Sequence, residues 1–96
     1  MNLRATFEKF NEHFLQFDAA ENKLHHRPDI CAFLLLDKLV LSDKHRGMIS
    51  KAALDQIWLE TDCDKLEEVA SEGDILMLLR CGVMYDDETE SLSMFV

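Results

Sequence analysis

The fold is decided by the C-terminal stretch SEGDILMLLRCGVMYDDETESLSMFV, residues 71–96. Its first part predicts a helix. Ser71 is suited to cap the first turn, and Asp74 three residues later gives a weak form of the capping box. Gly82 stands where a glycine commonly ends a helix, shortly after Arg80 in the last turn. The apolar face of this helix is supplied by Ile75, Leu76, Leu78 and Leu79.

The rest of the stretch predicts a β-hairpin. Residues 83–85 form its first strand, and the acidic residues 86–90 form the turn. In the second strand, residues 91–96, the apolar side chains of Leu92, Met94 and Val96 fall on one face. This alternation has the period of a strand with one buried face.

The middle of the chain predicts one strand and one short helix. Residues 56–61, Gln-Ile-Trp-Leu-Glu-Thr, are rich in β-branched and aromatic side chains and favour a strand. Asp62 can then cap a short helix that runs to about Ala70. Residues 48–54 fit either a short helix or the approach to a strand, and residues 42–47 are polar enough to form a loop.

The N-terminal half predicts a pair of helices. Leu3 and four phenylalanines recur with spacings of 4, 3, 4 and 3, which places them on one stripe of a helix that ends near Leu24. Pro28 marks the start of the second helix, because proline is tolerated at the first helical position. This second helix extends to about residue 41 and is apolar nearly all round, so we expect it to be the central buried element.

These elements predict an α+β fold in a single domain spanning residues 1–96. An N-terminal helical pair is followed by a small, mostly antiparallel three-stranded sheet with two short helices, and the chain closes with the C-terminal β-hairpin. A chain of 96 residues can bury one hydrophobic core and has no room for a second.

The charge is distributed unevenly along the chain. Residues 1–51 contain eight Lys and Arg against seven Asp and Glu, whereas residues 52–96 contain two against twelve. The net charge of −9 therefore belongs to the second half. Direct binding to nucleic acid is disfavoured, because contacts to phosphate require Lys and Arg.

Several function classes find no support in the sequence. The apolar run Ile30 to Leu36 is far shorter than the roughly 20 residues of a membrane span, and the N-terminus has no apolar signal segment, so we expect a cytoplasmic protein. The three cysteines are odd in number and suit reduced thiols. We find no spacing typical of metal ligands, no nucleophile motif and no glycine-rich phosphate loop, and expect neither an enzyme nor a cofactor.

The acids of the second half suggest a protein that docks on a basic surface of a partner. A strong form of this hypothesis is nucleic-acid mimicry, in which carboxylates take the place of phosphates. In size, acidity and lack of a catalytic motif, the chain is similar to the small accessory proteins by which bacteriophages block host defence enzymes. The residues expected to face the partner are Glu60, Asp64, Glu67, Glu68, Asp86, Asp87, Glu88 and Glu90.

The alternative is a structural or adaptor protein whose acidity only maintains solubility. In this alternative, part of the N-terminal apolar stripe forms a homodimer interface. The competing interpretation places the same side chains in the core, packed on the helix that starts at Pro28, and bulky phenylalanines favour it. The residues concerned are Phe7, Phe10, Phe14 and Phe17.

Overall fold

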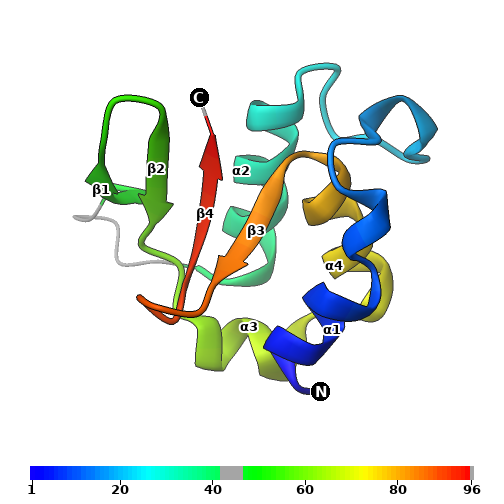
Figure 1. Ribbon diagram of the computed structural model, residues 1–96. Helices are drawn as coiled ribbons and strands as arrows, with labels where there is room; N and C mark the ends of the chain where they lie inside the picture. The colour runs from blue at the N-terminus through cyan, green and yellow to red at the C-terminus, as the bar shows by residue number, and fades with distance from the viewer. Residues whose placement is uncertain (42–46, 96) are drawn as a thin grey trace.

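The computed structural model describes residues 1–41 and 47–95 and has the predicted α+β class (Figure 1). The helices are α1 (Leu3–Lys9), α2 (Pro28–Leu39), α3 (Cys63–Val69) and α4 (Glu72–Arg80). Two single turns of 3₁₀ helix, η1 (Asn11–His13) and η2 (Phe17–Ala19), follow α1. The strands are β1 (Ile49–Ala52), β2 (Gln56–Leu59), β3 (Val83–Asp86) and β4 (Ser91–Phe95). Among the described residues, none of the helices combines the length and the apolar composition that a membrane span requires.

The strands form one antiparallel sheet in the order β1-β2-β4-β3. β3 and β4 make the predicted C-terminal hairpin, with Val83 opposite Met94 and Asp86 opposite Ser91. The predicted three-stranded sheet is one strand short, because part of the ambiguous segment 48–54 forms the edge strand β1. All four residues of β1 are exposed, so its sequence lacks the alternation of a half-buried strand. The predicted loop residues 42–46 and the last predicted strand residue, Val96, lie outside the described residues.

The caps predicted in the second half are present. The Asp62 carboxylate accepts hydrogen bonds from two backbone N–H groups in the first turn of α3. At the start of α4 the Ser71 hydroxyl accepts the N–H of Asp74 at 3.1 Å, and the Asp74 carboxylate accepts the N–H of Ser71 at 2.9 Å. Gly82 follows α4 with a φ of 98°, a backbone conformation that glycine adopts without strain.

The central helix is α4 and not α2. α4 contacts α1, α2, β3 and both 3₁₀ turns, and its Ile75 and Leu78 side chains are fully buried. α2 begins at Pro28 as predicted and buries one side, which includes Leu36. On its other side Leu34 is 44% exposed. The expectation of a centrally buried α2 is therefore wrong, because this helix packs at one side of α4 and leaves part of its apolar surface uncovered.

The single N-terminal helix predicted as far as Leu24 is also wrong, because α1 ends at Lys9. Leu15 has a positive φ of 64°, which a helix cannot accommodate, and its N–H donates to the carbonyl of Leu79 in α4 at 3.0 Å. The segment after α1 therefore folds as two separate turns over the end of α4. The core interpretation of the stripe is confirmed, since Phe7 and Phe17 are buried, although α1 packs mainly on α4, α3 and β3.

The remaining stripe residues, Phe10 and Phe14, are half-buried against the same core. The homodimer interface proposed for the stripe thus loses its two buried members, and only these half-buried rings could contribute to it.

Removing the Leu78 side chain tests the central position of α4. Leu78→Ala leaves a cavity at a fully buried site, so we expect it to lower the free energy of unfolding by about 2–5 kcal/mol. The matched control is Leu54→Ala at a fully exposed leucine, which should change stability by less than about 0.5 kcal/mol. Urea denaturation followed by circular dichroism measures both. Equal losses in the two variants would contradict the central position of α4.

Candidate functional site

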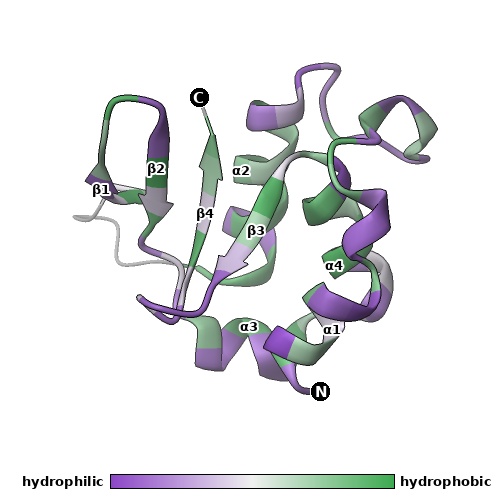
Figure 2. Ribbon diagram, viewed as in Figure 1, coloured by the Kyte–Doolittle hydropathy of each residue, from purple (hydrophilic) through white to green (hydrophobic). Residues whose placement is uncertain are grey.

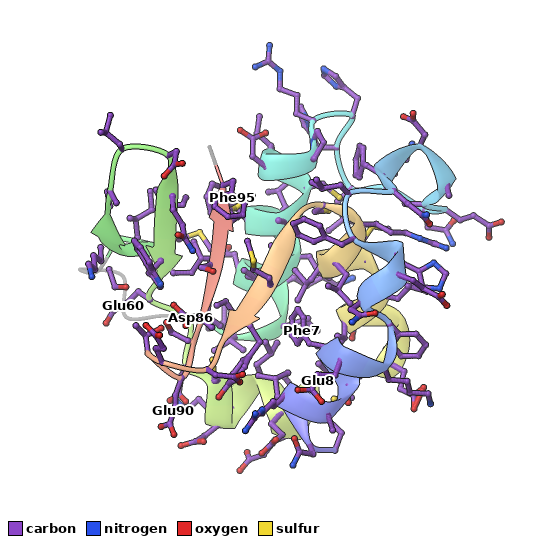
Figure 3. The ribbon with its side chains drawn as sticks, viewed as in Figure 1. Phe7, Glu8, Glu60, Asp86, Glu90 and Phe95 are labelled. Atoms are coloured by element: carbon purple, nitrogen blue, oxygen red, sulfur yellow. The ribbon has the colours of Figure 1, made fainter. Side chains whose placement is uncertain are left out.

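Carboxylates from two distant segments meet at one end of the molecule. Asp64 and Glu67 of α3 line a surface hollow of about 280 Å³ together with Asp87 and Glu90 of the turn between β3 and β4. We call this space the acidic hollow. Figure 2 shows the hydrophilic colour of this turn, and Figure 3 shows Glu90 and Asp86 at the same end of the sheet. The fold therefore gathers side chains of two segments that lie twenty or more residues apart in the sequence.

The sheet and the N-terminus bring these segments together. α3 follows β2, β2 pairs with β4, and the β3–β4 turn consequently lies next to the start of α3. The Glu67 carboxylate also accepts the backbone N–H of Leu3 at 2.6 Å. This bond satisfies one of the N–H groups that the start of α1 leaves without an intrahelical partner. Glu67 is therefore a structural link between α3 and α1 as well as a charge in the hollow.

Among the residues that the structure describes, one cation, Arg4, lines the acidic hollow. Its guanidinium lies 3.0 Å from the Asp87 carboxylate and 3.6 Å from the Glu8 carboxylate. All three side chains are more than half exposed. Exposed ion pairs of this kind contribute about 0–1 kcal/mol each, so Arg4 reduces the local negative charge without fixing the surface rigidly.

Asp86 points away from this hollow toward the sheet. Its carboxylate accepts the indole N–H of Trp58 at 2.7 Å and the backbone N–H of Glu88 at 2.9 Å. The hydrogen bond from Trp58 is the main cause that lowers the pKa of Asp86, and the backbone bond acts in the same direction. The geometry accordingly gives Asp86 a structural part in the hairpin, by tying the turn to β2.

The other three predicted residues lie at or near the same end. Glu68 and Glu88 are exposed on α3 and on the β3–β4 turn. Glu60 follows β2, is half-buried, and donates its backbone N–H to the carbonyl of Met48 at 2.7 Å. The structure thus places four of the predicted acids around one hollow, two beside it on the same segments, and two, Glu60 and Asp86, closer to the sheet.

Sequence reasoning missed Arg4 and Tyr85, which both line the acidic hollow. Arg4 lies in the nearly neutral first half of the chain, and its one local signal is the spacing of four residues to Glu8. Its approach to Asp87 depends on α1 lying against β3, which no local pattern predicts.

The phenylalanine stripe borders a second hollow. Phe7, Phe14 and Leu79 line about 330 Å³ of space together with Met84 and Tyr85. The Phe7 and Tyr85 ring centroids are 6.4 Å apart. Because Arg4, Glu8 and Asp87 also line this hollow, it adjoins the acidic one and is polar at its rim.

Two of the cysteine thiols, Cys63 and Cys81, have the opposite character to activated nucleophiles. All three cysteines are free, Cys31 and Cys81 are buried and Cys63 is half-buried. Burial raises the pKa of Cys63 to about 11 and that of Cys81 to about 12. An activated thiol requires a lowered pKa. In the part of the chain that the structure describes, no group of three His, Cys, Asp or Glu side chains is arranged to hold a metal ion.

Comparisons of the chain with protein-family models, with curated proteins and with solved structures found no match. A function is therefore inferred from the chain's own surface. Its most distinctive feature is the acidic hollow, because it joins charges that the sequence separates.

The Trp58–Asp86 bond predicts a pH dependence of stability. Because folding lowers the pKa of Asp86, its carboxylate stabilises the native state fully above about pH 4, the usual value for an unfolded aspartate. This contribution is lost as the pH falls through the lower, folded pKa. We expect the free energy of unfolding to fall more steeply between about pH 4 and pH 2 in the wild type than in Asp86→Asn. Urea denaturation across that range measures it, and identical slopes would contradict the assignment.

The raised thiol pKa values predict slow chemical labelling. At pH 8, Cys63 and Cys81 should react with Ellman's reagent at least about 100-fold more slowly in the native chain than in urea, because their thiolate fractions are much smaller. The absorbance of the released aromatic thiolate gives the reaction rate in the native chain and in urea. A native thiol that reacts as fast as in urea would show that one cysteine is exposed and activated.

Proposed function

We propose that this chain is a non-enzymatic protein-binding module whose acidic end docks on a basic surface of a partner. We define the acidic end as α3 together with the β3–β4 turn. The observation that carries the proposal is the convergence of carboxylates from both segments on the acidic hollow. Acids that served solubility alone would have no reason to gather around one concave surface.

The charges at the acidic end are suited to steering a partner. Asp64, Glu68, Glu88 and Glu90 are exposed, so their fields reach a partner before contact. Complementary charge raises association rates and selects against partners of the wrong sign. These exposed carboxylates are hydrated in the free protein. A partner's Lys or Arg side chains would replace part of that hydration with direct hydrogen bonds.

Arg4 sets the chemistry of docking in the hollow. A partner's cation that enters must share Asp87 with Arg4 or displace it. Displacement costs little, because the Arg4–Asp87 pair is exposed and such pairs contribute about 0–1 kcal/mol. Arg4 can then turn toward Glu8, which it already approaches.

The finer form of the proposal makes the partner a nucleic-acid-binding protein or a host defence enzyme in the cytoplasm, blocked in the manner of a phage inhibitor. Duplex DNA carries one charge per roughly 1.7 Å of axis, and clustered carboxylates imitate such a density better than scattered ones do. The clustering at the acidic end supports this form. The solubility alternative predicts that binding follows net charge wherever the acids lie.

Two variants of equal net charge distinguish these outcomes. The first neutralises the acidic end with Asp64→Asn, Glu68→Gln, Glu88→Gln and Glu90→Gln. The second neutralises four exposed acids elsewhere, with Asp18→Asn, Glu21→Gln, Asp37→Asn and Asp55→Asn. Affinity for a fluorescent lysine-rich peptide is measured by anisotropy at low and high salt. We expect the first variant to bind the peptide at least about 10-fold more weakly than the second at low salt. We also expect high salt to weaken the binding of the peptide to the wild type.

Equal weakening in both variants would mean that the peptide senses net charge alone, and the proposal would then fail. Because none of the eight substituted side chains is buried, we expect both variants to keep the fold, and circular dichroism checks this.

A further inference from the structure

A large apolar hollow lies at the opposite end of the sheet from the acidic end. About 450 Å³ of space separates the first turns of α2 from the strands, between Phe33 on one side and Ile49, Ile57, Met94 and Phe95 on the other. We call this space the apolar groove. Figure 3 shows Phe95, which lines the groove, at one end of β4, and Glu90, which lines the acidic hollow, at the other.

The groove is open because the helices do not cover β1. Ile49 of β1 stands opposite Leu59 of β2 in the antiparallel register. Leu59 is 2% exposed, whereas Ile49 is 49% exposed. The side of the sheet that is packed at β2 is therefore left uncovered at β1, where a branched apolar side chain meets water.

Two further apolar side chains in this part of the chain are exposed. Phe95 is 57% exposed, and Leu54 in the turn between β1 and β2 is fully exposed. Figure 2 shows that the β1 side of this turn has the hydrophobic colour, whereas its β2 side and the β3–β4 turn have the hydrophilic colour. Exposed apolar side chains that gather at a groove are typical of interaction sites, because they are costly to leave in water.

Two residues of opposite charge lie close together at the start of α2. Arg27 and Asp29 flank Pro28 at the start of α2, and Asp29 lines the groove. Within residues 1–41 and 47–95, neither side chain takes part in an ion pair. A two-fold interface brings the same patch of both copies together, so Arg27 of one copy can meet Asp29 of the other, and the reverse.

The net charge of the chain opposes self-association in general and restricts which faces of two copies can meet. With a net charge of −9, two copies repel each other most strongly when their acidic ends approach. Contact through the apolar grooves keeps the two acidic ends far apart and leaves both free. We propose that the apolar groove is a homodimer interface, in which Phe95 of each copy enters the groove of the other and Arg27 pairs with Asp29 across the two-fold axis.

This interface differs from the one that the phenylalanine stripe of the N-terminal segment suggested. The stripe is largely committed to the core, whereas Ile49, Leu54 and Phe95 are exposed. The inference is also independent of the proposed binding function, since the dimer leaves the acidic end uncovered.

Sedimentation equilibrium of the wild type and of two aspartate variants tests the interface. We expect a monomer–dimer equilibrium between about 10 μM and 1 mM. Phe95→Asp should raise the dimer dissociation constant at least about 30-fold, the loss expected for an anchoring aromatic residue at an interface. The matched control, Leu41→Asp, places the same charge at a leucine that is 80% exposed and does not line the groove. It should change the constant less than about 3-fold.

Exchange of the rim charges gives a second test that preserves the apolar groove. Arg27→Asp and Asp29→Arg should each weaken the dimer, because each single variant places like charges across the axis. The double variant restores opposite charges and should return the dissociation constant to within about 3-fold of the wild type. Circular dichroism monitors α2 in all three.

Three results would overturn the inference. The first is a wild type that remains monomeric at about 1 mM, where even weak self-association is visible. The second is a Phe95→Asp variant that dimerises as tightly as the wild type, which would assign the dimer to another face. The third is a double charge variant that remains as weak as the single variants.

Discussion

Burial of α4 is the constraint on which the rest of the structure depends. Its apolar side, with Ile75 and Leu78 fully buried, is shared by α1, α2 and β3, so each of these elements is positioned by the same helix. The C-terminal end of α4 also needs partners for its carbonyl groups. The Leu79 carbonyl accepts N–H groups from both Leu15 and Gly82. The N-terminal segment therefore gives up helical geometry at Leu15 and completes the end of α4.

Local patterns predicted the second half of the chain well. The caps at Asp62 and Ser71 and the glycine at 82 act through neighbouring residues, so the sequence around them is sufficient. The first half was predicted less well, because the helical spacing of the phenylalanines competes with a hydrogen bond to a residue more than sixty positions away. The sequence also did not assign β1 clearly, because all residues of this edge strand are exposed and it therefore lacks the alternation of buried and exposed side chains.

The candidate site shows the same division between local and distant information. The sequence identified the acids, but it could not show that α3 and the β3–β4 turn lie side by side, because that proximity depends on the pairing of β2 with β4. It also could not show that Glu67 binds the N–H of Leu3, that Asp86 binds Trp58, or that Arg4 reaches Asp87. These contacts show that Glu67 and Asp86 also hold the fold together.

The molecule thus has an acidic end and an apolar end, set apart by the length of the sheet. Chemical-shift changes in the ¹⁵N-labelled chain, recorded while the lysine-rich peptide is added, test most directly whether the acidic end is a binding surface. The account predicts that shifts concentrate at Arg4, in residues 63–69 and in residues 86–90. Shifts spread evenly over every exposed acid, Asp18 and Asp37 included, would show that the charge acts diffusely and that the acidic hollow is not a binding site.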